Sequence, residues 1–160
     1  MRSPGGRYKR GGLAATRADE YGIQVVKGLM ARLPQVKPEE IDDLIVGCSF
    51  PECEQGMNLA RIIALGADLP ISVSGMTVNR FCSSGLQAIA DATAKIRAGW
   101  SDIIIAGGCE TMSHIPMGGS AQRPLPDYPW DKPYPYVSMG ITAENVATNY
   151  NVAREDLDKF

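Results

Sequence analysis

Apolar side chains recur at helical spacing near the start of the chain. They are separated by three, four and three residues, at Ile23, Val26, Met30 and Leu33. This spacing places all four on one side of a helix and predicts an amphipathic helix from Asp19 to Leu33. Proline at the next position ends it.

The stretch Ile71–Asn79 has strand composition, with apolar side chains at Ile71, Val73, Met76 and Val78. Two other apolar runs are continuous and bounded by polar residues, Leu44–Cys48 and Asp102–Gly108. Runs of this length are typical of strands covered on both faces. Helical patterns separate them at Met57–Ala67 and Ser84–Ala98. Strands that alternate with helices predict an α/β fold, a layered sheet with covering helices whose parallel strands are joined by right-handed crossovers.

The helix predicted at Ser84–Ala98 carries a stripe of its own. The residues that face one way are Leu86, Ile89, Ala90, Thr93 and Ile96. A stripe of this spacing gives the helix one coherent face.

Composition changes after Ser113. Six prolines between positions 116 and 135, Pro133 among them, predict a long irregular segment. A helical pattern returns at Met139–Tyr150, where Thr142 is the expected N-cap. Acidic residues from Glu155 onward read as the start of another helix, and we expect the chain to be cut there.

Composition and charge narrow the class of protein. The 160 residues are 44% hydrophobic and 21% charged, with a formal net charge of −2. These values fit a globular domain and offer no broad basic surface for nucleic acid. No apolar run reaches the ~18 residues that span a bilayer, so we expect no membrane segment and a cytoplasmic location.

Four cysteines stand at positions 48, 53, 82 and 109, with a single histidine in the chain. They form no pair of close CxxC motifs, which argues against a zinc site. Cys48 ends an apolar run and Cys109 follows two glycines, so both are predicted to be small buried residues.

Cys82 stands in the stretch VNRFCSSGLQA, where strand composition gives way to a helical pattern. If the strand ends at Cys82 and the helix begins at Ser83 or Ser84, the thiol lies at a helix N-terminus. Free N–H groups and the helix dipole favour an anion there, and the thiolate is the nucleophilic form. The backbone N–H of Cys82 is a candidate oxyanion donor. A buried structural cysteine at the strand end is the alternative.

Several ordered segments of the chain resemble the thiolases, a family of acyl-CoA C-acyltransferases. The segment VNRFCSSGLQA is similar to the family's VN-x-x-C-x-S-G, and GGCETMS to its GG-x-E-x-MS. Farther on, MGITAEN resembles MG-x-TAEN. Upstream, RSPG is similar to R-T-P-x-G and GMNLAR to G-x-N-x-AR. The resemblance covers essentially the whole chain in the family's order.

The resemblance implies roles for particular residues. Cys82 would be the acyl-accepting nucleophile, with its N–H bonded to the thioester oxygen. Met139 would line the acyl pocket, although a gap-filling core methionine is an equal alternative. Asn79 and Glu110 are expected to be buried structural residues that satisfy backbone groups. His114 is not expected to be the base, because the family's histidine lies in a GHP-type segment that this chain lacks.

The chain departs from the family mainly in length. Thiolases are more than twice as long and have two similar halves, the second of which supplies the histidine, a water-holding asparagine and a second cysteine. The resemblance therefore predicts a thiolase N-terminal α/β domain at 1–115 and a truncated start of the loop domain at 116–160. It also predicts that the first strand of this half is missing and that apolar faces are exposed.

The implied reaction is cleavage of a 3-ketoacyl-CoA by CoA, of the degradative β-oxidation type. Coenzyme A is then a substrate, and no metal or bound cofactor is implied. Expected partners are a second copy of the chain, in a dimer or tetramer, or a complementing C-terminal half. Three alternatives stay open: a biosynthetic acetoacetyl-CoA thiolase, a non-catalytic fragment or subunit that needs a complementary chain, and a redox role for Cys82.

Overall fold

The computed structural model describes residues 1–121, 123–129, 131–132 and 134–160. Pro133, one of the six prolines noted above, lies outside the described residues. The chain divides into two compact units, Met1–Ala121 and Gln122–Phe160. The assignment of 1–115 and 116–160 to two thiolase domains stays a prediction. No helix among the described residues is long and apolar enough to cross a membrane.

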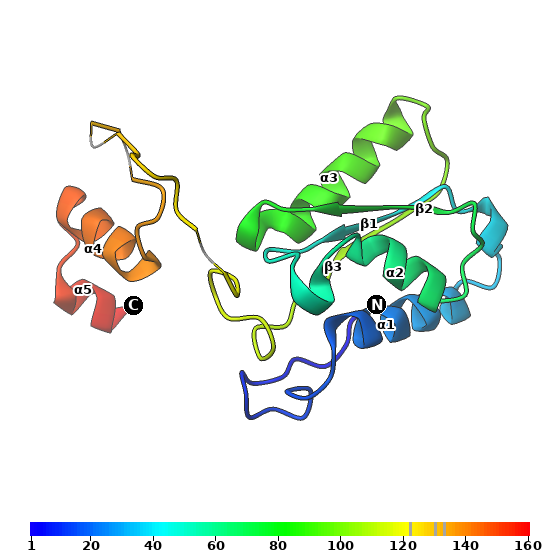
Figure 1. The fold of residues 1–160 in the computed structure, drawn as a ribbon, viewed down its shortest axis with the longest axis horizontal. Coiled ribbons are helices and arrows are strands. Elements are labelled where there is room, and N and C mark those ends of the chain that lie inside the picture. The colour runs from blue at the N-terminus through cyan, green and yellow to red at the C-terminus, as the bar shows by residue number, and fades with distance from the viewer. Residues whose placement is uncertain (122, 130, 133) are drawn as a thin grey trace. The chain divides into compact units, whose positions relative to one another are not determined.

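The first unit is built on a parallel sheet of three strands (Figure 1): β1 Asp43–Gly47, β2 Ser74–Val78 and β3 Ile104–Gly108. Their order is β2-β1-β3, so β1 is central and its five residues are buried. In register, Gly47 of β1 pairs with Val78 and Gly108. The α/β fold expected from the sequence is confirmed.

The second strand is shorter than predicted. Ile71 is 83% exposed and lies in a turn before the strand, which begins at Ser74. The Arg61 guanidinium donates to the carbonyl oxygens of Ile71, at 3.0 Å, and of Val73. Because these carbonyls are bonded to a side chain and not to a neighbouring strand, the pairing of β2 with β1 begins only at Ser74.

Helices cover both faces of the sheet (Figure 1). On one face α1, Ala18–Arg32, and α2, Leu59–Gly66, form the larger core with β1. On the other face lies α3, Ser84–Arg97, over Ile45. Short 3₁₀ turns, η1 Pro38–Glu40, η2 Cys53–Gln55 and η3 Phe81–Ser83, connect these elements. Cys48 and Cys109 are buried, as the sequence predicts.

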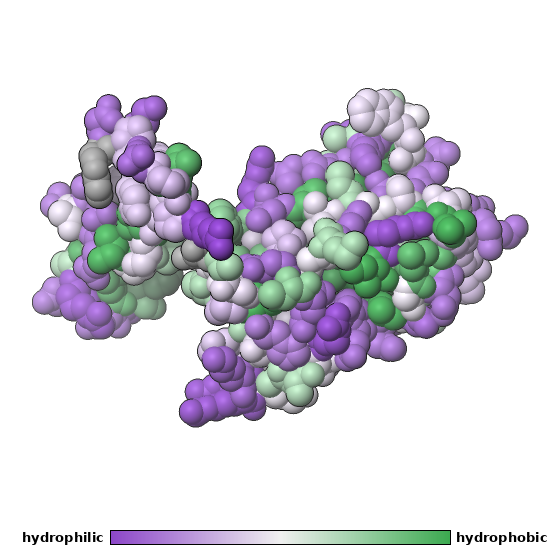
Figure 2. All heavy atoms as spheres, in the orientation of Figure 1, coloured by the Kyte–Doolittle hydropathy of each residue, from purple (hydrophilic) through white to green (hydrophobic). Residues whose placement is uncertain are grey.

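Small side chains form the face of α3 that contacts the sheet. The buried residues of the helix are Ser84, Ala88 and Ala92. The large apolar residues of the predicted stripe lie outside this contact, since Leu86, Ile89 and Ile96 are 69%, 52% and 43% exposed. This leaves a row of large apolar side chains on the surface of the first unit, and Figure 2 shows apolar residues among polar ones over this unit.

The second unit contains α4, Met139–Asn149, and α5, Arg154–Lys159. The expected N-cap of α4 is wrong. Ser138 is the cap, and its Oγ accepts from the Ile141 N–H at 3.4 Å. Thr142 lies one turn inside the helix, where its hydroxyl donates to the Ser138 carbonyl oxygen. A threonine can form this internal bond as readily as a cap, so residue type alone did not place the helix start.

The close approach of α3 to β1 generates a prediction about Gly47. A Cβ at this position would lie 2.5 Å from the Gly85 nitrogen and would overlap the Ser84 backbone. Because neither backbone can retreat, Gly47→Ala should destabilise the fold by about 3 kcal/mol. Urea unfolding followed by circular dichroism measures this loss.

The matched control is Gly107, which lies beside Val46 in the neighbouring strand. A Cβ there meets nothing within 4 Å. Gly107→Ala should therefore change the free energy of unfolding by less than about 1 kcal/mol. Equal losses in the two variants would contradict the assignment of the cost to the contact between α3 and β1.

Candidate functional site

Cys82 lies in the turn that joins β2 to α3. The strand ends at Val78, one residue before the predicted end at Asn79, and η3 carries the chain from Phe81 into α3 at Ser84. The thiol is exposed. This exposure contradicts the alternative of a buried structural cysteine and leaves the thiol open to a reagent or substrate.

The residue before Cys82 has an unusual backbone conformation. Phe81 has a φ of +46°, in the left-handed region that bulky side chains rarely adopt. The Asn79 Oδ1 accepts from the Phe81 N–H at 2.9 Å. The Ser84 Oγ donates to the Phe81 carbonyl oxygen at 2.5 Å and accepts from the Arg80 N–H at 2.9 Å. Both polar groups of the Phe81 backbone are therefore fixed by side chains.

This conformation presents Cys82 just before the first turn of α3. In the part of the chain that the structure describes, no acceptor is bonded to the Cys82 N–H. A free N–H beside an exposed thiol fits the geometry expected of an oxyanion donor. The first-turn N–H groups of α3 supply further positive potential nearby.

A cluster of hydrogen bonds around Gln55 holds the loop after β1, which contains Ser49 and Phe50. Gln55 is fully buried, and its Nε2 donates to Glu110 Oε1 at 2.6 Å and to the Phe50 carbonyl at 2.9 Å. Its Oε1 accepts from the Thr111 N–H at 2.6 Å. The other Glu110 oxygen accepts from the Ser49 N–H at 2.5 Å. Both Glu110 oxygens therefore face donors.

Gln55 was missed by the sequence analysis. It lies in the 3₁₀ turn η2, where neither a periodic pattern nor a motif marks it. The only signal was its position between an apolar run and the G-x-N-x-AR-like segment.

The expected burial of Asn79 and Glu110 is wrong, although both bind backbone groups as predicted. Asn79 is exposed and Glu110 is half-buried. Asn79 Nδ2 donates to the Ser49 carbonyl at 2.9 Å, and Glu110 accepts from the N–H of the same residue. Both side chains lie on connections after strands, where one side faces solvent while the other reaches the neighbouring loop.

The lone histidine is bound to other groups. His114 Nδ1 lies 2.5 Å from Glu54 Oε1, and its Nε2 lies 2.9 Å from the Ala14 carbonyl oxygen. Both ring nitrogens face oxygen acceptors that link the N-terminal segment to η2. This arrangement agrees with the expectation that His114 is not the base for Cys82.

The two buried thiols, Cys48 and Cys109, have raised pKa values. Burial, followed by the nearby Glu110 carboxylate, raises the pKa of Cys48 from about 9 to about 12. Burial, followed by Cys48, raises the pKa of Cys109 to about 12 as well. Burial also raises the pKa of Tyr21, whose hydroxyl donates to the Glu110 carbonyl. These groups stay neutral near pH 7, so neither buried thiol is a nucleophile there.

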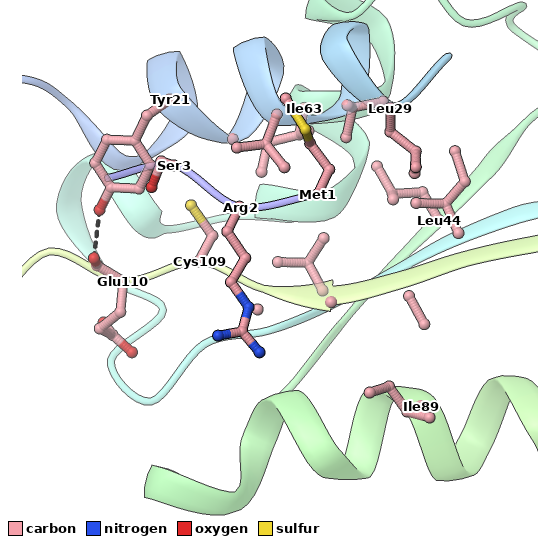
Figure 3. Close-up of a pocket in the computed structure, with 18 of the residues that line it drawn as sticks. Met1, Arg2, Ser3, Tyr21, Leu29, Leu44, Ile63, Ile89, Cys109 and Glu110 are labelled. Carbon is pink, nitrogen blue, oxygen red and sulfur yellow. Dashed lines mark hydrogen bonds between the residues drawn. The ribbon is translucent and has the colours of Figure 1, made fainter. Parts of the chain in front are cut away.

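A cavity of about 590 Å³ lies beside β3 and under α1 (Figure 3). Its walls are mostly apolar and include Leu29, Leu44 and Ile63, with Met1 and Arg2 along it. Cys82 is not among its lining residues. The cavity is therefore separate from the exposed thiol.

Met139 is the first residue of α4 and is 72% exposed within the second unit. Its predicted role in an acyl pocket stays a prediction. Among the described residues, no group of three or more His, Cys, Asp or Glu side chains is arranged to hold a metal ion.

The buried thiols generate a prediction about alkaline pH. Because the folded pKa values are raised, stability is intact below about pH 9 and falls as pH rises toward 12, since the unfolded chain loses these protons first. At pH 10 we expect a loss of about 2 to 3 kcal/mol relative to pH 8. Denaturant unfolding at several pH values measures this slope.

The double variant Cys48→Ala/Cys109→Ala should flatten the slope between pH 8 and 10, even if it is less stable at neutral pH. Cys53→Ala is the matched control, because Cys53 is exposed. A double variant that keeps the wild-type slope would show that other groups titrate.

Comparisons with known proteins identify a family. The family model described as "Thiolase, N-terminal domain" matches residues 1–160. A 3-ketoacyl-CoA thiolase of Bacillus subtilis is 50% identical over 159 residues, which are 99% of this chain and 40% of that protein. One of Idiomarina loihiensis is 42% identical over 160 residues, all of this chain and 41% of that protein.

A solved structure, the acetyl-CoA acetyltransferase of Bacillus anthracis, has a TM-score of 0.80 and 31% identity, over 99% of this chain and 42% of its own. The chain thus spans about two fifths of the length of the relatives it matches. Since the family model covers every residue, the chain belongs to the thiolase family, within its N-terminal domain.

Proposed function

We propose that this chain carries the nucleophile of a thiolase that cleaves 3-ketoacyl-CoA with CoA, and that Cys82 is the residue that becomes acylated. The observation that carries the proposal is the exposed Cys82 thiol, in a fixed turn at the start of α3. Its position within the thiolase-like VN-x-x-C-x-S-G segment supports the same role.

The chemistry follows from a thiolate at this position. The Cys82 sulfur attacks the 3-keto carbon, and the Cys82 N–H donates to the oxygen that becomes negative. The bond between the α- and β-carbons breaks, and its electron pair leaves on the α-carbon as the enolate of acetyl-CoA, which a general acid protonates. The thiolate of a second CoA then attacks the acyl-enzyme and releases a shortened acyl-CoA with the Cys82 thiolate.

In this proposal the general acid and the enolate stabiliser come from another part of the enzyme. His114, the only histidine, is bound to Glu54 and Ala14. We propose that a complementing C-terminal half supplies these groups and packs on the exposed apolar face of α3. Packing there would cover Leu86, Ile89 and Ile96. The complete enzyme is then expected to be a dimer or tetramer in the cytoplasm, with CoA as substrate and no bound cofactor.

The degradative direction is favoured over the biosynthetic one. The relatives at 50% and 42% identity are named 3-ketoacyl-CoA thiolases. The acetyl-CoA acetyltransferase structure is 31% identical, and its name supports acetoacetyl-CoA synthesis as the second candidate. Turnover on long and short 3-ketoacyl-CoA substrates, measured with both halves present, separates the two.

The proposal predicts an acyl-enzyme at one cysteine. Incubation of the purified chain with acetyl-CoA should place one acetyl group on Cys82, slowly, because the thiol is exposed but the proposal places the other catalytic groups in a complementing half. Peptide mass spectrometry locates the group. Cys82→Ala should abolish this acetylation, whereas Cys53→Ala should leave it unchanged.

Equal acetylation of Cys53 and Cys82 would overturn the assignment, because both thiols are exposed and only Cys82 precedes a long helix. Steady turnover of acetoacetyl-CoA by this chain alone would contradict the need for a second half. A complementing half should restore turnover to the wild-type chain and not to Cys82→Ala.

A further inference from the structure

Asn79 connects the turn that carries Cys82 to the neighbouring loop. Its side-chain oxygen accepts from the Phe81 N–H at 2.9 Å, and its side-chain nitrogen donates to the Ser49 carbonyl at 2.9 Å. The two bonds assign the amide orientation without ambiguity, because one partner is a donor and the other an acceptor. One exposed side chain thus joins two segments that are 30 residues apart.

Ser49 is itself fixed from the opposite side. Its N–H donates to Glu110 Oε2 at 2.5 Å, and Gln55 Nε2 donates to the other Glu110 oxygen at 2.6 Å. Gln55 is fully buried. A continuous path of hydrogen bonds therefore runs from Gln55 through Glu110, Ser49 and Asn79 to the backbone next to Cys82.

The path of hydrogen bonds ends at Phe81, whose backbone conformation is unfavourable for a bulky side chain. At φ +46° the Phe81 backbone is sterically strained, as a glycine would not be. Residues in such a conformation persist only where surrounding contacts hold them. The Phe81 ring also lies 6.1 Å, centroid to centroid, from that of Phe50 in the same loop as Ser49. These contacts hold the backbone that leads into Cys82.

We infer that Asn79 is a positioning residue for Cys82 and that Glu110 acts on Cys82 through Ser49 and Asn79. The inference rests on the proposed function in treating Cys82 as the nucleophile. Asn79 and Glu110 do not touch the reacting atoms in this assignment. They set the direction of the thiol and keep it beside the start of α3.

The test compares the reactivity of two exposed thiols in the same molecule. The full chain is treated with iodoacetamide at pH 7, and peptide mass spectrometry gives the labelling rates of Cys82 and Cys53. Asn79→Ala should lower the ratio of Cys82 to Cys53 labelling about tenfold, the size of effect that loss of one well-placed hydrogen bond can produce. Labelling of Cys48 and Cys109 reports any general unfolding.

Asn58→Ala is the matched control. Asn58 also makes several hydrogen bonds, to the Gly75 carbonyl, the Arg61 N–H and the Thr77 hydroxyl, but none reaches the Cys82 turn. This variant should lower the melting temperature at least as much as Asn79→Ala and leave the labelling ratio unchanged. An unchanged ratio in Asn79→Ala, or an equal fall in Asn58→Ala, would overturn the inference.

A double-variant cycle tests the path to Glu110. Glu110→Gln places an amide NH₂ against one of two donors, so it should lower the ratio about threefold in the wild-type background. In the Asn79→Ala background it should have no further effect, because the connection is already broken. Fully multiplicative effects would show that Glu110 does not act through Asn79.

The readout needs no acyl substrate. If the labelling ratio falls as expected but Cys82 accepts no acetyl group from acetyl-CoA, the positioning role stands and the proposed function fails. If Cys82 is acetylated at the same rate in Asn79→Ala and wild type, with an unchanged labelling ratio, the proposed function stands and the positioning role fails.

Discussion

The close packing of α3 on β1 is the constraint on which the site depends. Gly47 allows the Ser84 and Gly85 backbone to lie directly against the strand. Ser84, buried at this contact, then holds the Phe81 carbonyl and the Arg80 N–H from the helix side. The position of the Cys82 turn is thus determined first by how near a helix can approach a sheet.

The loops after β1 and β3 also fix the position of the Cys82 turn. Ser49 follows β1 and Glu110 follows β3. Because the strands are parallel, both residues lie at the same end of the sheet as the carboxyl end of β2. Asn79, just after β2, reaches Ser49 at that edge. The Ser49 backbone and the Asn79 and Glu110 side chains, each just after one of three parallel strands, therefore meet at one end of the sheet, as polar groups commonly do in α/β proteins.

Much of the fold and the main candidate residue could be predicted from sequence. The first helix was expected at Asp19–Leu33 and spans Ala18–Arg32, because the apolar stripe marks the side that packs on the core, where Val26 is buried and Ile23 and Met30 are partly buried. The turn at Cys82 could be predicted because a strand pattern ends and a helical pattern begins near it. The binding of Asn79 to backbone groups was predicted as well, but its particular partners and those of Gln55 were not, because only the folded chain brings them near.

The outward stripe of α3 shows why pattern alone does not assign a core. Leu86 and Ile89 are the more apolar residues, yet Ala88 and Ala92 face the sheet, because close backbone contact leaves room only for small side chains. The Cys82 turn precedes α3, and the exposed apolar row lies along the length of the same helix. In the proposed enzyme, a partner surface that buries this row also approaches Cys82, so exclusion of water from the thiol and assembly of the two halves become one event.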